Sequence, residues 1–134
     1  MNVKTDTKEK FHVITISEPS LAANMTAELE QSLQVYLEND VKNVVLNCKD
    51  IGEMDDAAAE TIIKIQQNFY EHNASFVVCC LSSALQEQLD QKGLLELMNE
   101  TPSESEAGDI VQMEEIEREL MDSADPQFNL TEDD

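Results

Sequence analysis

Residues 44–69 have the sequence VVLNCKDIGEMDDAAAETIIKIQQNF, and this stretch decides the fold. Its opening run, Val44 to Leu46, is short, continuous and apolar, which is typical of a strand buried on both faces. Asp55 stands where a helix N-cap is expected. Apolar residues then recur at the spacing of one helix face, at Ala58, Ile62, Ile65 and Phe69. The pattern predicts a buried strand followed by a helix over 56–72.

Residues 76–98, FVVCCLSSALQEQLDQKGLLELM, show the same order of elements. The apolar run 76–81 predicts a second buried strand. Ser83 and Gln86 have the spacing of a capping box, which predicts that a helix begins there. Gly93 is expected to end this helix, because glycine accepts the left-handed conformation that follows a helix C-terminus.

The flanking segments complete the pattern of alternating strands and helices. FHVITI (11–16) is rich in β-branched residues and predicts a strand, with residues 1–6 pairing to it as a hairpin. A four-residue apolar repeat predicts a helix over roughly 25–38, with inward positions Met25, Leu29, Leu33 and Leu37.

Near the C-terminus, Leu97 and Met98 are expected to begin a short last strand. Thr101 and Glu104 have capping-box spacing and predict the start of a final amphipathic helix. Its expected inward face consists of Ile110, Met113, Ile116 and Leu120. Residues 122–134 lack periodicity and are expected to be an acidic flexible tail.

This order predicts an α/β fold. We expect a mixed sheet of about five strands and about four helices, with parallel central strands joined by right-handed crossovers. The helices are expected to cover one side of the sheet, within one domain over residues 1–121. The expected core includes Leu29, Leu33, Val45, Ile62, Ile65, Val77 and Leu89.

Charge and cysteine content limit the classes of function. The formal net charge is −21, which argues against nucleic acid and anionic membranes as partners and is compatible with a basic protein partner. Acidity also serves solubility alone in many proteins. The three cysteines lack metal-binding spacing, so we expect no metal. The sequence contains no Gly-rich phosphate loop, and we expect no cofactor. The reduced cysteines and the polar sequence of residues 1–10 favour a cytoplasmic protein.

The two central stretches and ISEPSLAANMTAEL (16–29), taken in this order, resemble a STAS domain, the fold of bacterial anti-sigma factor antagonists. In VVLNCKDIGEMDD (44–56), a strand and loop lead to the start of a helix, where the family has Asp-Ser-Ser-Gly. The resemblance implies a non-enzymatic regulatory domain that binds a protein, an anti-sigma factor or a kinase-like regulator. It also implies the STAS-like sheet described above.

The resemblance implies a partner-binding surface at this helix start. Asp55 matches the family's Asp, and Asp56 stands at the position of the phosphorylated Ser or Thr. Ala57 and Ala58 replace the second Ser and the Gly. Leu21 and Ala22 match the start of the family's first helix, where Ala22 replaces an Asp. The resemblance therefore implies that no phosphorylation occurs at the usual site.

Other interpretations of the acidic pair stay open. Asp55 and Asp56 fit a helix N-terminus through capping and the helix dipole, and Asp56 also fits a partial mimic of a phosphorylated side chain. A catalytic pair is disfavoured, because successive residues at a helix start diverge by about 100°. His12 and His72 are far apart in the sequence and are not expected to be metal ligands.

Two other classes of protein share features of this sequence. A response-regulator receiver would need an acidic pair after the first strand and a Lys after the fifth, and neither is present. The alternative that remains is a structural or accessory STAS subunit of a larger complex, such as a transporter or a signalling scaffold.

Overall fold

The two buried strands predicted from the sequence lie side by side at the centre of a mixed sheet. In the computed structural model, which describes residues 1–123, β4 (Val44–Asn47) and β6 (Phe76–Cys79) pair in parallel, with Val45 opposite Val77. Every residue of both strands is buried. Strands of this kind need packing layers on both of their faces.

The sheet has the order β1-β2-β4-β6-β7. β1 (Val3–Thr7) pairs antiparallel with β2 (His12–Ile16), which confirms the predicted hairpin, and the other pairings are parallel. The last strand is β7 (Glu100–Thr101), which begins three residues later than predicted. Leu95–Leu97 instead forms a turn of 3-10 helix, η3, so the prediction of a strand beginning at Leu97 was wrong.

Four α-helices accompany the sheet, in agreement with the sequence: α1 (Thr26–Gln34), α2 (Asp56–Glu71), α3 (Ser83–Gln91) and α4 (Glu104–Ser123). The predicted helix over 25–38 is divided, because the 3-10 turns η1 (Ala23–Met25) and η2 (Val35–Glu38) flank α1. Part of the expected tail, Asp122 and Ser123, belongs to α4, and the rest of the tail lies outside the described residues.

Two helix starts differ from the predicted capping boxes. Ser82, and not Ser83, caps α3, and its hydroxyl oxygen accepts a hydrogen bond from the Leu85 amide at 3.1 Å. At α4 the box is formed by Ser103 and Glu106, whose amide donates to the Ser103 hydroxyl at 3.1 Å. Thr101 lies two residues before the N-cap position of α4, and its hydroxyl donates to the Ser103 carbonyl at 2.7 Å.

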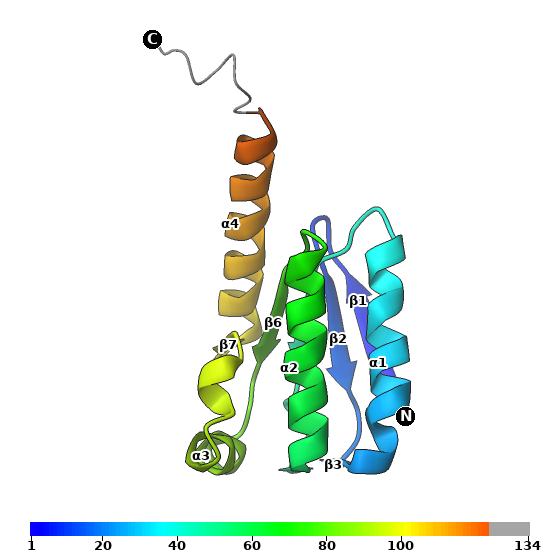
Figure 1. Ribbon diagram of the computed structural model, residues 1–134, viewed down its shortest axis with the longest axis vertical. Helices are drawn as coiled ribbons and strands as arrows, with labels where there is room; N and C mark the ends of the chain where they lie inside the picture. The colour runs from blue at the N-terminus through cyan, green and yellow to red at the C-terminus, as the bar shows by residue number, and fades with distance from the viewer. Residues whose placement is uncertain (124–134) are drawn as a thin grey trace.

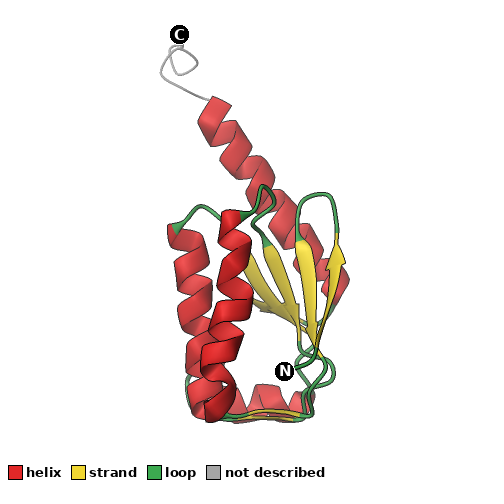
Figure 2. Ribbon diagram, turned by 90° about the vertical axis from the view of Figure 1, so that its right-hand side faces the viewer, coloured by secondary structure: helices red, strands yellow, loops and turns green. Residues whose placement is uncertain are grey.

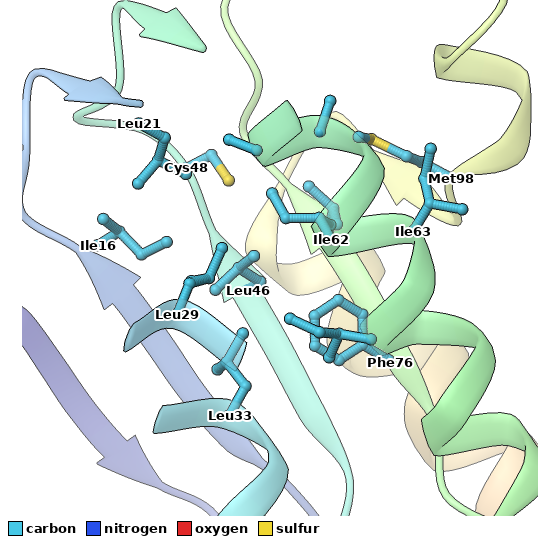
Figure 3. Close-up of a cluster of buried hydrophobic side chains, with 14 of the residues drawn as sticks. Ile16, Leu21, Leu29, Leu33, Leu46, Cys48, Ile62, Ile63, Phe76 and Met98 are labelled. Carbon is cyan, nitrogen blue, oxygen red and sulfur yellow. The ribbon is translucent and has the colours of Figure 1, made fainter. Parts of the chain in front are cut away.

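The larger core lies between the sheet and helices α1 and α2 (Figure 3). Leu85 and Leu89 of α3 belong to the same cluster. Alternate strand residues point into it, because successive side chains in a strand face opposite sides. Five of the predicted core residues are buried here, which confirms the helical periodicity: Leu29, Leu33, Ile62, Ile65 and Leu89.

The other face of the sheet is covered by α4, so the prediction that helices cover one side only was wrong (Figure 2). The remaining predicted core residues, Val45 and Val77, point to this face and pack with Ala107 and Val111 of α4. The helix lies close to the sheet at Gly108, where an added Cβ atom would lie 3.0 Å from the Phe11 ring. Small side chains on α4 therefore allow its close approach.

The predicted inward face of α4 is exposed. Ile110 is 36% exposed, Met113 60%, Ile116 55% and Leu120 62%. The buried face is the opposite one, because Ala107 and Val111 contact the sheet. The C-terminal half of α4 extends past the end of the sheet, where the sheet offers no surface to cover it (Figure 1).

Polar side chains hold α4 against the domain. The side-chain nitrogen Nδ2 of Asn43 donates to Glu115 Oε1 at 3.0 Å, and Arg118 donates to the same oxygen at 3.0 Å. Together, the hydrogen bond from Asn43 and the nearby guanidinium lower the pKa of Glu115 below its ordinary value. Glu114 accepts hydrogen bonds from the hydroxyls of Tyr70 (2.7 Å) and Ser75 (2.6 Å).

We predict that Leu29→Ala lowers the free energy of unfolding by about 2–5 kcal/mol, because a fully buried side chain leaves a cavity. The matched control Leu97→Ala, at a leucine that is 52% exposed, is expected to change it far less. Urea denaturation of the three proteins measures both effects. Equal losses from the two substitutions would contradict the assignment of the core.

The lowered pKa of Glu115 predicts a pH-dependent contribution to stability. Because the folded-state pKa lies below the ordinary value of 4.5, this contribution is fully present above pH 4.5 and is lost as pH falls through the folded pKa. We expect Glu115→Gln to destabilise the protein at neutral pH. The difference in stability between wild type and variant should shrink in acid. Thermal unfolding at several pH values tests this, with the exposed Glu117→Gln as a charge-matched control. A difference that is independent of pH would contradict the assignment.

Candidate functional site

Two loops are joined beside the start of α2 by a second, two-stranded sheet. In it, β3 (Ser20–Leu21) pairs in parallel with β5 (Glu53–Met54). The Pro19 carbonyl accepts hydrogen bonds from the amides of Gly52 (2.8 Å) and Glu53 (3.2 Å). The loop leading into α1 and the loop leading into α2 therefore form one surface, at the end of the domain where β3 is labelled in Figure 1.

Asp55 links these two loops. It is the N-cap residue of α2, as predicted, but its side chain makes no capping hydrogen bond to the helix. Instead, its Oδ2 accepts a hydrogen bond from the Ala23 amide at 2.9 Å, and its own amide donates to the Leu21 carbonyl at 2.9 Å. The Asp55 carboxylate thus fixes the loop before α1 rather than the first turn of α2.

Asp56 is the first residue of α2, and its side chain is exposed. Its Oδ1 lies 2.5 Å from Nζ of Lys92, the C-cap residue of α3. With side chains 53% and 44% exposed, this ion pair is worth at most about 1 kcal/mol. The pair matters mainly for the charge of the surface, because it places the Lys92 ammonium group beside the Asp56 carboxylate. Sequence reasoning missed Lys92, which lies 36 residues away.

The other residues named from the sequence fall into two groups. Ala57 is exposed and Ala22 is half-buried, so both can contribute to the surface. Leu21 and Ala58 are each 1% exposed, so their side chains support the site from beneath. The nearest hydroxyl within α2, that of Thr61, donates to the Ala57 carbonyl at 2.8 Å.

The geometry of the site does not suit acid–base catalysis by its two carboxylates. Such a pair must converge on one reacting atom, whereas Asp55 binds Ala23 and Asp56 binds Lys92. Outside the site, burial raises the pKa of the Cys48 thiol to about 12, which keeps it protonated at neutral pH. The site presents exposed charged groups, the Asp56 carboxylate and the Lys92 ammonium, to another molecule.

Each histidine ring lies within hydrogen-bond distance of a backbone carbonyl oxygen. Nε2 of His12 lies 2.9 Å from the Val41 carbonyl oxygen, and Nδ1 of His72 lies 2.8 Å from the Asn68 carbonyl oxygen. Within residues 1–123, no three His, Cys, Asp or Glu side chains gather closely enough to hold a metal ion. Over the same residues, no helix has the length and apolar character needed to cross a membrane.

Comparisons with solved structures agree with this architecture. An anti-sigma factor antagonist from Mycobacterium paratuberculosis matches with a TM-score of 0.70 and 13% identity, covering 83% of this chain and 93% of that one. The anti-sigma factor antagonist SpoIIAA in its unphosphorylated form matches with a TM-score of 0.64 and 14% identity, covering 83% and 96%. The murine anion transporter Slc26a9 matches with a TM-score of 0.62 and 13% identity, covering 78% of this chain and 18% of the transporter.

At such low identities these likenesses establish the fold, which is the α/β fold of STAS domains. The family follows from the sequence itself, because the family model described as "STAS domain" matches residues 2–107, most of the chain. The chain belongs to the STAS domain family.

Proposed function

We propose that this protein is a regulatory, partner-binding STAS domain that acts like an anti-sigma factor antagonist, without catalysing a reaction. The observation that carries the proposal is the exposed carboxylate of Asp56 at the first turn of α2. The resemblance to the family motif aligns this position with the hydroxyl that is phosphorylated in anti-sigma factor antagonists. The binding surface consists of Asp55, Asp56 and Ala57, with Ala22 at its edge.

In this proposal the site has one fixed electrostatic state. No Ser or Thr occurs from residue 55 to 60, and the Thr61 hydroxyl is bonded within the helix. A carboxylate carries one negative charge, compared with about 1.5–2 for a phosphoserine. The ammonium of Lys92 offsets much of that single charge. The pair therefore imitates a phosphorylated side chain poorly, and we propose that the partner contacts the carboxylate directly.

The partner is a protein with a basic surface, of the anti-sigma factor or kinase-like regulator class. The net charge of −21 supports a basic partner, because opposite charges accelerate encounter and select against acidic proteins. The same charge disfavours nucleic acid. Three free cysteines, two of them buried, fit a reducing cytoplasm, where we place the interaction.

An accessory or scaffold role is the second candidate, and a specific observation favours it: part of an anion transporter, Slc26a9, has the same fold. A pull-down with the wild-type protein distinguishes the two roles. Recovery of an anti-sigma kinase supports the regulatory role, whereas recovery of transporter subunits supports the accessory role.

We predict that Asp56→Ser and Asp56→Ala each weaken binding to the captured partner, by about threefold to thirtyfold, the range of one charge-assisted hydrogen bond at an exposed site. Calorimetric titration of the wild type and both variants measures this, and Asp40→Ala, at an exposed acid in the loop before β4, is the matched control. If Asp56→Ser binds more tightly than the wild type, Asp56 imitates a phosphorylated state. Identical affinities would remove Asp56 from the mechanism.

We predict that Asp55→Ala acts on the same binding indirectly. Loss of the carboxylate frees the Ala23 amide, so hydrogen exchange at Ala23 should accelerate while exchange in β4 is unchanged. Partner affinity should fall, because the loop before α1 is no longer held in position. NMR exchange rates for wild type, Asp55→Ala and the control Asp40→Ala test this. Unchanged exchange at Ala23 would contradict the proposed positioning role.

A further inference from the structure

Helix α4 carries an apolar stripe that the domain leaves uncovered. We define the α4 stripe as Ile110, Met113, Ile116 and Leu120, whose exposed fractions are 36%, 60%, 55% and 62%. Their spacing of three and four residues places them along one side of the helix. Ala107 and Val111, on the opposite side, pack against the sheet. A continuous apolar stripe on an exposed helix is typical of a surface that binds another element.

The α4 stripe is separate from the site at the start of α2. That site lies beside β3, at one end of the domain, whereas the C-terminal half of α4 projects from the opposite end (Figure 1). Helix α4 also lies on the face of the sheet away from α1 and α2 (Figure 2). A molecule bound to the stripe would therefore not compete with one bound at Asp56.

The surroundings of the stripe are acidic. Helix α4 contains eight acidic residues and one basic residue, Arg118, which already pairs with Glu115. Asp109 and Glu117 each lie one turn from Met113, so they stand within the exposed face. Both are exposed. The face combines apolar anchors with uncompensated negative charge.

This combination selects among the possible occupants. A second copy of the chain would bring the same acids together, and like charges across an interface oppose association. The segment 124–134 has four acids and no base, so its charge also opposes binding to α4. An amphipathic helix with basic flanks fits both features, because its apolar side covers the stripe and its Lys or Arg residues meet the acids.

We propose that the exposed face of α4 binds a basic amphipathic helix of a protein partner. The α4 stripe supplies the buried apolar area, with anchors at the i, i+3 and i+7 positions that helix pairs use. Asp109 and Glu117 supply electrostatic selection. The protein then has two binding surfaces, at opposite ends of one domain.

The probe is a synthetic Leu/Lys peptide of about 18 residues, five helical turns, with Leu spaced to form one stripe. A peptide of the same composition with scrambled Leu positions controls for general attraction to an acidic protein. Fluorescence anisotropy measures both affinities for the full chain. The test variant, Ile116→Ser with Leu120→Ser, removes two stripe residues and keeps every charge. Its control, Val35→Ser with Leu97→Ser, removes two side chains that are each 52% exposed elsewhere.

We expect the patterned peptide to bind the wild type and the control variant at least about tenfold more tightly than the stripe variant, which corresponds to about 1.4 kcal/mol. Binding should weaken as salt rises. Circular dichroism checks that each variant folds. Equal affinity for wild type and stripe variant, or for patterned and scrambled peptides, would overturn the proposal.

Two further measurements identify a wrong occupant. A wild-type dimer in sedimentation equilibrium that the stripe variant abolishes would show that a second copy covers α4, and would overturn the proposal. Phe128→Ser with Leu130→Ser in the full chain should leave peptide affinity unchanged. A tenfold rise would show that the chain's own C-terminal segment competes for the stripe, and would likewise overturn it.

Discussion

The burial of both faces of β4 and β6 is the constraint on which the rest of the structure depends. Each residue of these strands is removed from water, and the larger aliphatic ones contribute about 1.5–3 kcal/mol each. One face is covered by the packed layer of α1 and α2. On the other face, a single helix, α4, covers Val45 and Val77. The small residues Ala107 and Gly108 let that helix approach the sheet closely.

The same sheet determines where the proposed binding surface forms. Parallel strands direct their following loops to one edge, and the pairing of β3 with β5 joins two of those loops. The two adjacent carboxylates then have different surroundings. Asp55 holds the loop before α1 through the Ala23 amide, while Asp56 faces solvent beside Lys92. The first organises the surface and the second, in our proposal, meets the partner.

The sequence allowed the element order, the parallel centre and the core positions to be predicted, because apolar periodicity reports them directly. The prediction for the buried face of α4 was wrong. The most regular apolar repeat of that helix, Ile110 to Leu120, lies on its exposed side. Periodicity shows that a helix has an apolar side but not that the sheet covers it, and Ala107 and Val111 gave a weaker signal. The Asp56–Lys92 pair and the β3–β5 pairing join residues more than 30 positions apart, so no local pattern reports them. Asp55 looked like a helix cap because its position fits one, but the Ala23 amide binds its carboxylate.

We propose that the partner binds at the joined loops beside the start of α2. Hydrogen–deuterium exchange of the protein, alone and with its captured partner, tests this most directly, since binding slows exchange where amides are covered. If the partner binds there, exchange slows on binding in residues 20–24 and 53–60. Unchanged exchange in both segments, with protection confined to other parts of the domain, would contradict it.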